Sequence, residues 1–362
     1  MAQPARSALV LQGGGALGAY ELGAARRLYA DDGFAPDLIA GVSIGAITAV
    51  LLARPAAGLT PLRALEKFWD QVTVSGWFLP PPLRPYASVL GNPGFFAPRL
   101  DVIDLSNWTS LYDVGPLRRT LASLVDLEAL ADPGAEPRLL VTATDVAAGE
   151  IAYFRSDAQP LSLDHIVASG SLPPSFAMTE IGDRRYWDGG LFDNTPLGAV
   201  LDALPGGPGA DLAIYVVNLF PNRAPLPRNM AEVAERMLNL QFANKTAEDV
   251  KLLARFDEVA RLMEALETLP ADHPVKASEG YRAVLRQRYV AVPRIVAITR
   301  PEQAGGFDGN DFSPAAIAER AAEGWAQTEK ALAEARDAPR AGGGAMARKP
   351  AAATVSRGGG NG

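Results

Sequence analysis

The stretch that decides the fold is residues 37–53, which read DLIAGVSIGAITAVLLA. Its first part, Asp37–Val42, is a short continuous apolar run, and such a run is typical of a strand buried on both faces. Small and apolar residues follow at once and predict a helix over Ile44–Pro55. Ser43 lies at the junction between the two. A serine placed directly between a buried strand and a helix is a candidate nucleophile.

The glycines around Ser43 strengthen this interpretation. Gly41 and Gly45 flank it in the pattern Gly-x-Ser-x-Gly, and residues without a Cβ let the strand and the helix pass closely at a sharp turn. The start of the helix also offers free N–H groups and a positive dipole end to a developing oxyanion. The bare pattern often occurs by chance, so its place between strand and helix is what favours a catalytic serine.

Similar apolar runs recur along the chain. They lie at residues 7–11, 138–144, 212–219 and 294–299. Helical spacing separates them, beginning with residues 16–30, and strands that alternate with helices predict a mostly parallel sheet covered on both faces. We therefore predict an α/β fold, a three-layer sandwich with a mostly parallel central sheet.

The chain divides by composition into three parts. We predict a catalytic core over residues 1–225 and a helical C-terminal extension over 226–337 that contributes one further strand. Residues 338–362 carry four basic and no acidic side chains among many glycines and alanines, which is typical of a disordered basic tail. A weak tether to a membrane or a partner is the alternative role for this tail.

Charge and composition exclude several classes of protein. The net charge of −7 argues against nucleic-acid binding and against strong attraction to anionic lipid. The absence of cysteine excludes disulfides, thiolate zinc sites and a cysteine nucleophile. The sequence shows no apolar run of about 18 residues and no signal-peptide pattern. We expect a cytoplasmic location, with peripheral membrane contact as the alternative, and the oligomeric state stays open.

A glycine-rich loop, Gly13–Gly18, follows the first predicted strand and matches Gly-x-Gly-x-x-Gly, so a dinucleotide site is one interpretation. That site needs an acid at the end of the second strand, but Asp37 precedes that strand and Ser43 follows it. The other interpretation is an oxyanion loop, whose main-chain donors face a tetrahedral intermediate. Its candidate donors are the N–H groups of Gly13, Gly14 and Gly15. Two such features at neighbouring strand ends favour acyl transfer.

The serine needs a base, and histidine is scarce. His273 would complete the order Ser, Asp, His, although a solvated turn position is the competing interpretation. His165 precedes an apolar segment, where a helix or core role is expected. Asp188, followed by Gly189 and Gly190, is the better candidate for the base. Its competing interpretation is a hairpin turn between β-prone residues.

Taken together, these motifs resemble the patatin-like phospholipase family. The family's glycine-rich loop, serine elbow and Asp-Gly-Gly occur here in the same order, as Gly13–Gly18, Gly41–Gly45 and Asp188–Gly190. Residues 168–176 and Asn194-Thr195-Pro196 resemble further family segments. The resemblance covers residues 7–220, and residues 307–332 look like the C-terminal extension of one bacterial subgroup.

The resemblance implies a patatin-like three-layer fold and a catalytic dyad in which Asp188 acts as base on Ser43, with no metal and no cofactor. The supporting motif residues are Gly18, Gly41, Gly45, Gly189 and Gly190. It implies a serine esterase of lipids, a phospholipase A-type acyl hydrolase that cleaves carboxylic esters. A Ser–Asp–His hydrolase of non-lipid esters is the alternative, and a dinucleotide-binding protein is the more distant one. Leu17 stands where many relatives carry Arg or Lys, which predicts weak recognition of phosphate head groups.

An aromatic, proline-rich segment at residues 76–100 lacks any periodicity. Its aromatic residues are Trp77, Phe78, Tyr86, Phe95 and Phe96. Two interpretations stay open: a flap over the acyl chain or a surface that touches lipid, and a stiff loop packed on the core.

Overall fold

The structure is a computed structural model, and it describes most of the chain. The described residues are 6–30, 34–76, 79–80, 87–101, 108–204, 212–221, 223, 225–243, 262, 265–286, 294–301 and 308–337. The predicted basic tail at 338–362 and the aromatic residues Trp77, Phe78 and Tyr86 lie outside them.

One large sheet organises the molecule, in the strand order β10-β9-β1-β2-β5-β8-β7, with β6 also paired to β5. The strands are β1 Arg6–Leu11, β2 Leu38–Gly41, β5 Arg138–Asp145, β6 Glu150–Arg155, β7 Thr179–Ile181, β8 Arg184–Asp188, β9 Leu212–Asn218 and β10 Arg294–Thr299. The run from β10 to β5 is parallel, whereas β6, β7 and β8 add antiparallel pairs. A separate antiparallel pair joins β3 Ala97–Pro98 to β4 Tyr112–Asp113.

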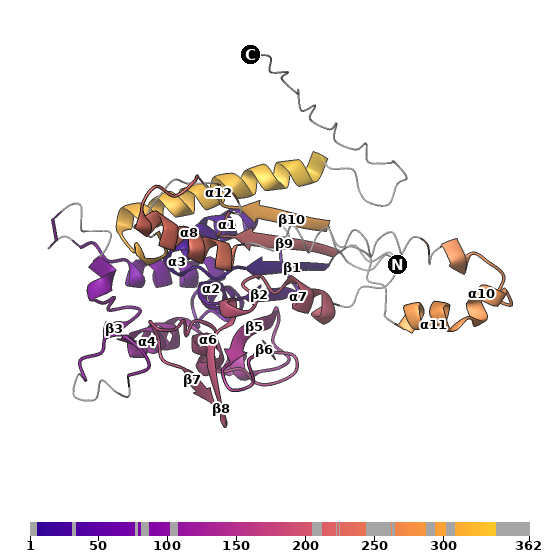
Figure 1. The fold of residues 1–362 in the computed structure, drawn as a ribbon, viewed down its shortest axis with the longest axis horizontal. Coiled ribbons are helices and arrows are strands. Elements are labelled where there is room, and N and C mark those ends of the chain that lie inside the picture. The colour runs from indigo at the N-terminus through magenta and orange to yellow at the C-terminus, as the bar shows by residue number, and fades with distance from the viewer. Residues whose placement is uncertain are drawn as a thin grey trace, which may run out of the picture.

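The helices of the described residues are α1 Ala19–Leu28, α2 Ile44–Ala53, α3 Pro61–Val72, α4 Gly115–Leu124, α5 Leu127–Ala131, α6 Leu163–Ser169, α7 Leu197–Ala203, α8 Met230–Phe242, α10 Pro274–Ala277, α11 Glu279–Arg286 and α12 Pro314–Asp337. Those that pack directly on strands of the sheet include α2, α6, α7 and α12. Short 3₁₀ turns include η1 Gly15–Gly18, η4 Gly189–Leu191 and η5 Asp308–Asn310. In Figure 1, α12 (yellow) runs beside α1 along the sheet, and both helices are in contact.

The strand residues alternate between two apolar clusters, one on each face of the sheet. Leu9 and Leu11 of β1 belong to the larger cluster, which includes α1, α2 and α3. Ala8 and Val10 point the other way and pack with α7. Two buried faces explain why these strands read as continuous apolar runs. The predicted α/β fold with its mostly parallel central sheet is therefore confirmed.

The segment predicted as a C-terminal extension supplies both β10 and α12. β10 pairs in parallel with β9, so the extension adds an edge strand to the same sheet. α12 packs on α1 and on β10. None of the helices in the described part of the chain is long and apolar enough to cross a bilayer.

Candidate active site

Ser43 occupies a strained turn between β2 and α2. Its φ of 55° makes it the one non-glycine residue with a positive φ in the described ranges. The neighbouring glycines explain how the turn fits. A Cβ at Gly41 would lie 2.2 Å from the Gly45 carbonyl oxygen, and one at Gly45 would lie 2.3 Å from the Leu11 carbonyl oxygen. Strain of this kind holds the serine above the end of the strand, as a nucleophile elbow requires.

Strand pairing brings Asp188 to the same place. β6 pairs along one edge of β5, so β2 and β8 share the other edge. On that edge Gly41, the last residue of β2, pairs with Val141, and Asp188, the last residue of β8, pairs with Ala143. The aspartate therefore arrives just beyond the end of β2, where the chain turns at Ser43. The Ser43 hydroxyl lies close enough to the Asp188 carboxyl to hold its pKa below the value that burial alone would give, and both residues line one cavity.

The Asp188 carboxyl group is buried and firmly held. Only 3% of the residue is exposed, and its Oδ1 accepts a hydrogen bond of 2.8 Å from the N–H of Gly190. Its own N–H donates to the Ser171 carbonyl at 3.0 Å, and its carbonyl accepts from Thr144 Oγ1 at 2.8 Å. Burial raises the pKa of Asp188 to about 7, against the opposing hydrogen bonds from Gly190 and Ser43. Such a carboxyl exchanges protons near neutral pH.

The glycine-rich loop lies against the serine. A Cβ at Gly13 would lie 2.9 Å from the Cβ of Ser43. The N–H of Gly13 donates to Asn194 Oδ1 at 3.1 Å, and Asn194 Nδ2 donates back to the Gly13 carbonyl at 3.1 Å. Among the described residues, no acceptor is found for the N–H of Gly14 or Gly15. Gly14 and Gly15 line the same cavity as Ser43, so their N–H groups are candidate donors to a ligand there.

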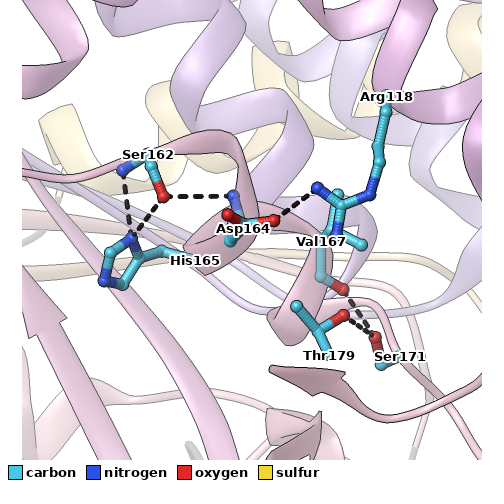
Figure 2. Close-up of polar contacts among 7 residues, drawn as sticks. All are labelled: Arg118, Ser162, Asp164, His165, Val167, Ser171 and Thr179. Atoms are coloured by element: carbon cyan, nitrogen blue, oxygen red, sulfur yellow. Dashed lines mark hydrogen bonds and ion pairs between the residues drawn. The ribbon is translucent and has the colours of Figure 1, made fainter. Parts of the chain in front are cut away.

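Helix α6 holds the turn at Ser43 in place, because Ser169 Oγ at the end of this helix accepts the N–H of Ser43 at 2.9 Å. Figure 2 shows how this helix is fixed. His165 Nδ1 accepts the N–H of Ser162 at 3.0 Å in a capping box, while Arg118 pairs with Asp164. The His165 ring packs edge-on against a phenylalanine, and burial lowers the pKa of His165. The structure thus places this histidine as a helix cap.

The remaining histidine, His273, caps the short helix α10, where its Nδ1 accepts the N–H of Val275 at 3.3 Å. Neither histidine is among the described residues that line the cavity at Ser43. The structure therefore brings Ser43 and Asp188 together and leaves both histidines elsewhere. In the described part of the chain, no three His, Cys, Asp or Glu residues gather where they could hold a metal ion.

A cavity of about 560 Å³ opens beside Ser43 and Asp188. Its walls are mainly apolar and aromatic, and include Phe95, Phe96, Tyr112, Phe176 and Phe312. Phe95 and Phe96 are buried, so this part of the aromatic segment packs on the core and also lines the cavity. Leu17 is buried in the same wall. The one cation among the described lining residues is Arg300, whose Nε lies 3.5 Å from the Glu323 carboxylate.

Three residues that hold the site could not be identified individually from the sequence. Asn194 and Ser169 fall within segments that resemble family blocks, but neither has a local pattern that reveals its contacts. Gln12 has no signal at all: its Oε1 accepts the N–H groups of Leu219 and Phe220 at 2.6 and 3.1 Å and so fastens the loop to the end of β9.

The fold and the site define a class: α/β proteins with a serine on a strained strand-to-helix turn beside a glycine-rich loop. The family model of patatin-like phospholipases matches residues 9–201, more than half of the chain, and the chain belongs to this family. At the level of its family, the protein is a lipid hydrolase.

Solved structures that match this chain include VipD from Legionella pneumophila, with a TM-score of 0.42 and 18% identity over 91% of this chain and 67% of that one. Full-length ExoU, solved with full-length SpcU of the type III secretion system of Pseudomonas aeruginosa, gives a TM-score of 0.37 and 15% identity over 93% of this chain and 54% of that one. No curated protein sequence matches this chain.

Proposed function

We propose that this protein is a serine esterase that hydrolyses lipid acyl esters, with Ser43 as nucleophile and Asp188 as its base. The observation that carries the proposal is that Ser43, on its strained turn, and the buried Asp188 carboxyl meet at the same end of the sheet and line one apolar cavity. Burial raises the pKa of this carboxyl to about 7. A carboxylate in water is a weak base, whereas one with a pKa near neutrality accepts the serine proton more readily and is still ionised at pH 7 to 8.

The reaction follows from this geometry. Ser43 Oγ attacks the acyl carbonyl carbon as its proton moves to the Asp188 carboxylate. The carbonyl oxygen becomes an oxyanion, which accepts hydrogen bonds from the N–H groups of Gly14 and Gly15. When the C–O bond to the alcohol breaks, Asp188 returns the proton to the leaving oxygen. A water molecule then attacks the acyl carbonyl carbon and gives one proton to the Asp188 carboxylate. The bond between Ser43 Oγ and that carbon breaks, Asp188 returns the proton to Ser43 Oγ, and the fatty acid departs.

The substrate class follows from the cavity. Its volume of about 560 Å³ lies within the roughly 300–1,000 Å³ typical of small-molecule sites, and its apolar walls suit an acyl chain. Leu17 adds an apolar side chain, and the cation Arg300 is already close to Glu323. We therefore expect acyl-chain contacts to dominate recognition. Neutral esters should be turned over at least as well as anionic phospholipids.

The rim of the cavity supports contact with a lipid surface. Val89, Leu111 and Leu238 line the cavity and are also exposed, by 50%, 49% and 41%. Exposed apolar side chains around the entrance to an acyl site offer a path from a lipid surface into the cavity. Peripheral membrane contact is thus part of the proposal.

The test is a panel of p-nitrophenyl esters and phospholipid vesicles, assayed with wild type, Ser43→Ala and the matched control His273→Ala. Wild type and the histidine variant should release fatty acid at equal rates, and Ser43→Ala should be inactive with an unchanged melting temperature. Full activity of Ser43→Ala would contradict the proposal. Loss of activity in His273→Ala would replace the dyad by a Ser–Asp–His triad.

A further inference from the structure

The chain beyond residue 307 reaches the glycine-rich loop, although it lies far outside the matched residues 9–201. Gly309, Asn310 and Phe312 line the same cavity as Ser43. The turn η5 lies against η1, the turn that follows the oxyanion donors. The active-site wall is therefore completed from the C-terminal segment.

The contact is one of backbone against backbone. Gly15 has a φ of +57°, and a Cβ there would lie 2.6 Å from the Gly309 carbonyl oxygen. Nothing larger than glycine fits at Gly15 without moving η5 or the loop. The position of η5 therefore limits the conformations open to the loop.

Arg320, at the start of α12, ties the two turns together. Only 5% of the residue is exposed, and its Nη1 donates to two main-chain carbonyl groups, Ala16 at 3.2 Å and Asp311 at 2.7 Å. One carbonyl belongs to the glycine-rich loop and the other follows η5. Hydrogen bonds from a buried guanidinium are charge-assisted, so this bridge is stronger than an ordinary main-chain contact.

Two further contacts fix the bridge in place. A Cβ at Gly23 would lie 1.8 Å from the Ala321 carbonyl oxygen, and one at Gly324 would lie 2.0 Å from the Tyr20 carbonyl oxygen, so α1 and α12 cross in backbone contact. This crossing leaves no room for α12 to slide along α1. At the other end of the segment, the Phe312 carbonyl accepts the N–H of Val74 at 2.9 Å.

We propose that residues 308–320 clamp the glycine-rich loop and that Arg320 is a positioning residue for the oxyanion donors of Gly14 and Gly15. A glycine-rich loop has more backbone freedom than other sequences, whereas oxyanion stabilisation depends on donors that are already in place before the reaction. Contact with residues 308–320 keeps these donors in place before the reaction. The clamp rests on the proposed function, because the loop matters for turnover only if it binds an oxyanion.

The kinetic test compares full-length wild type, Arg320→Met and Arg320→Lys with the control Glu329→Gln. Glu329 pairs with Arg27 between the same two helices, at the opposite end of α1 from the loop. Because a misplaced donor weakens binding of the transition state more than binding of the ester, Arg320→Met should lower kcat by about tenfold or more and change KM by less than about threefold. Arg320→Lys keeps a cationic donor, so its kcat should lie between those of wild type and Arg320→Met. Glu329→Gln should keep the wild-type kcat.

Amide hydrogen exchange gives a readout that does not depend on activity. The N–H of Leu17 donates to Gly14, and that of Ala19 donates to Ala16. Both amides should exchange faster in Arg320→Met and at the wild-type rate in Glu329→Gln. A wild-type kcat or wild-type exchange at these amides in Arg320→Met overturns the clamp. If Arg320→Met does not fold, the same two readouts on Arg320→Lys decide. If the turnover of wild type did not depend on Ser43, the proposed function would be contradicted. Amide exchange at Leu17 and Ala19 would then decide by itself whether residues 308–320 hold the glycine-rich loop.

Discussion

Replacing Asp188 by asparagine removes a buried carboxyl group while keeping its shape. The amide oxygen of asparagine can still accept the Gly190 N–H, which donates to Oδ1 of Asp188 at 2.8 Å. What the substitution removes is the ionisable group at this position. Burial raises the pKa of this carboxyl from 3.8 to about 7, so the folded state holds its proton more tightly than the unfolded state does.

The sign and size of the stability effect follow from this difference. A pKa raised in the folded state favours folding at low pH, and this advantage is lost as the pH rises from about 4 to about 7. A pKa difference of about 3 units, at 1.36 kcal/mol per unit, corresponds to about 4 kcal/mol at pH 8. Asparagine does not ionise, so Asp188→Asn does not lose this stability as the pH rises. The variant should therefore be more stable than wild type by about 4 kcal/mol at pH 8 and by less than about 2 kcal/mol at pH 5, while its turnover falls by about a thousandfold.

Urea denaturation at pH 5 and pH 8, together with kcat for a soluble ester, measures both effects. Asp145→Asn is a matched control on the same sheet, because the Ala148 N–H and the Arg184 guanidinium hold the pKa of Asp145 below its usual value. Stability from a lowered pKa is present above the unfolded pKa and lost as the pH falls, so this control should be less stable than wild type at pH 8. An Asp188→Asn variant whose stability advantage does not grow between pH 5 and pH 8 would refute the buried, high-pKa carboxyl.

Three further predictions concern the pH dependence of activity and of stability. The kcat/KM for a soluble ester should rise with pH, reach half its maximum near pH 7 and level off above about pH 8, because Asp188 must be ionised to accept a proton. A profile flat from pH 5 to 8 would contradict this. His273→Ala should reproduce the wild-type profile, and a profile that loses its step would make the histidine the base. Burial raises the pKa of Glu21 well above its usual range, and the Thr48 hydroxyl donates a hydrogen bond of 2.7 Å to its carboxyl group. The melting temperature of Glu21→Gln should therefore rise relative to that of wild type between pH 5 and 8. A constant difference in melting temperature would show that Glu21 does not titrate on unfolding.

The parts of the fold that could be predicted from sequence are those with a local signal. The apolar runs at residues 7–11 and 212–219 are strands because both sheet faces are covered, and this leaves a continuous pattern that needs no knowledge of partners. The elbow at Ser43 is equally local, since its glycines lie two residues away on either side.

The hairpin signal at Asp188 shows where local reasoning stops. The turn of the β7–β8 hairpin lies at Gly182, with a φ of +63°, and Asp188 instead ends β8 and leads into η4. Turn propensity was similar at both places, and the pairing of β8 with β5 decided between them.

Contacts between distant parts of the chain left no sequence signal. Arg320 meets Ala16 across 304 residues, and Gly23 faces α12 at a similar separation. Each residue looks ordinary in its own helix, because its importance lies in a close approach that only the folded chain creates.

The central claim is that Ser43 is the nucleophile and Asp188 its base. The most direct measurement is the second-order rate of labelling by a fluorophosphonate probe, with the modified residue mapped by peptide mass spectrometry. The account predicts a single adduct on Ser43 in wild type, none in Ser43→Ala, and labelling of Asp188→Asn slowed by about a hundredfold or more. An adduct on another residue, or equal labelling of wild type and Ser43→Ala, would contradict it.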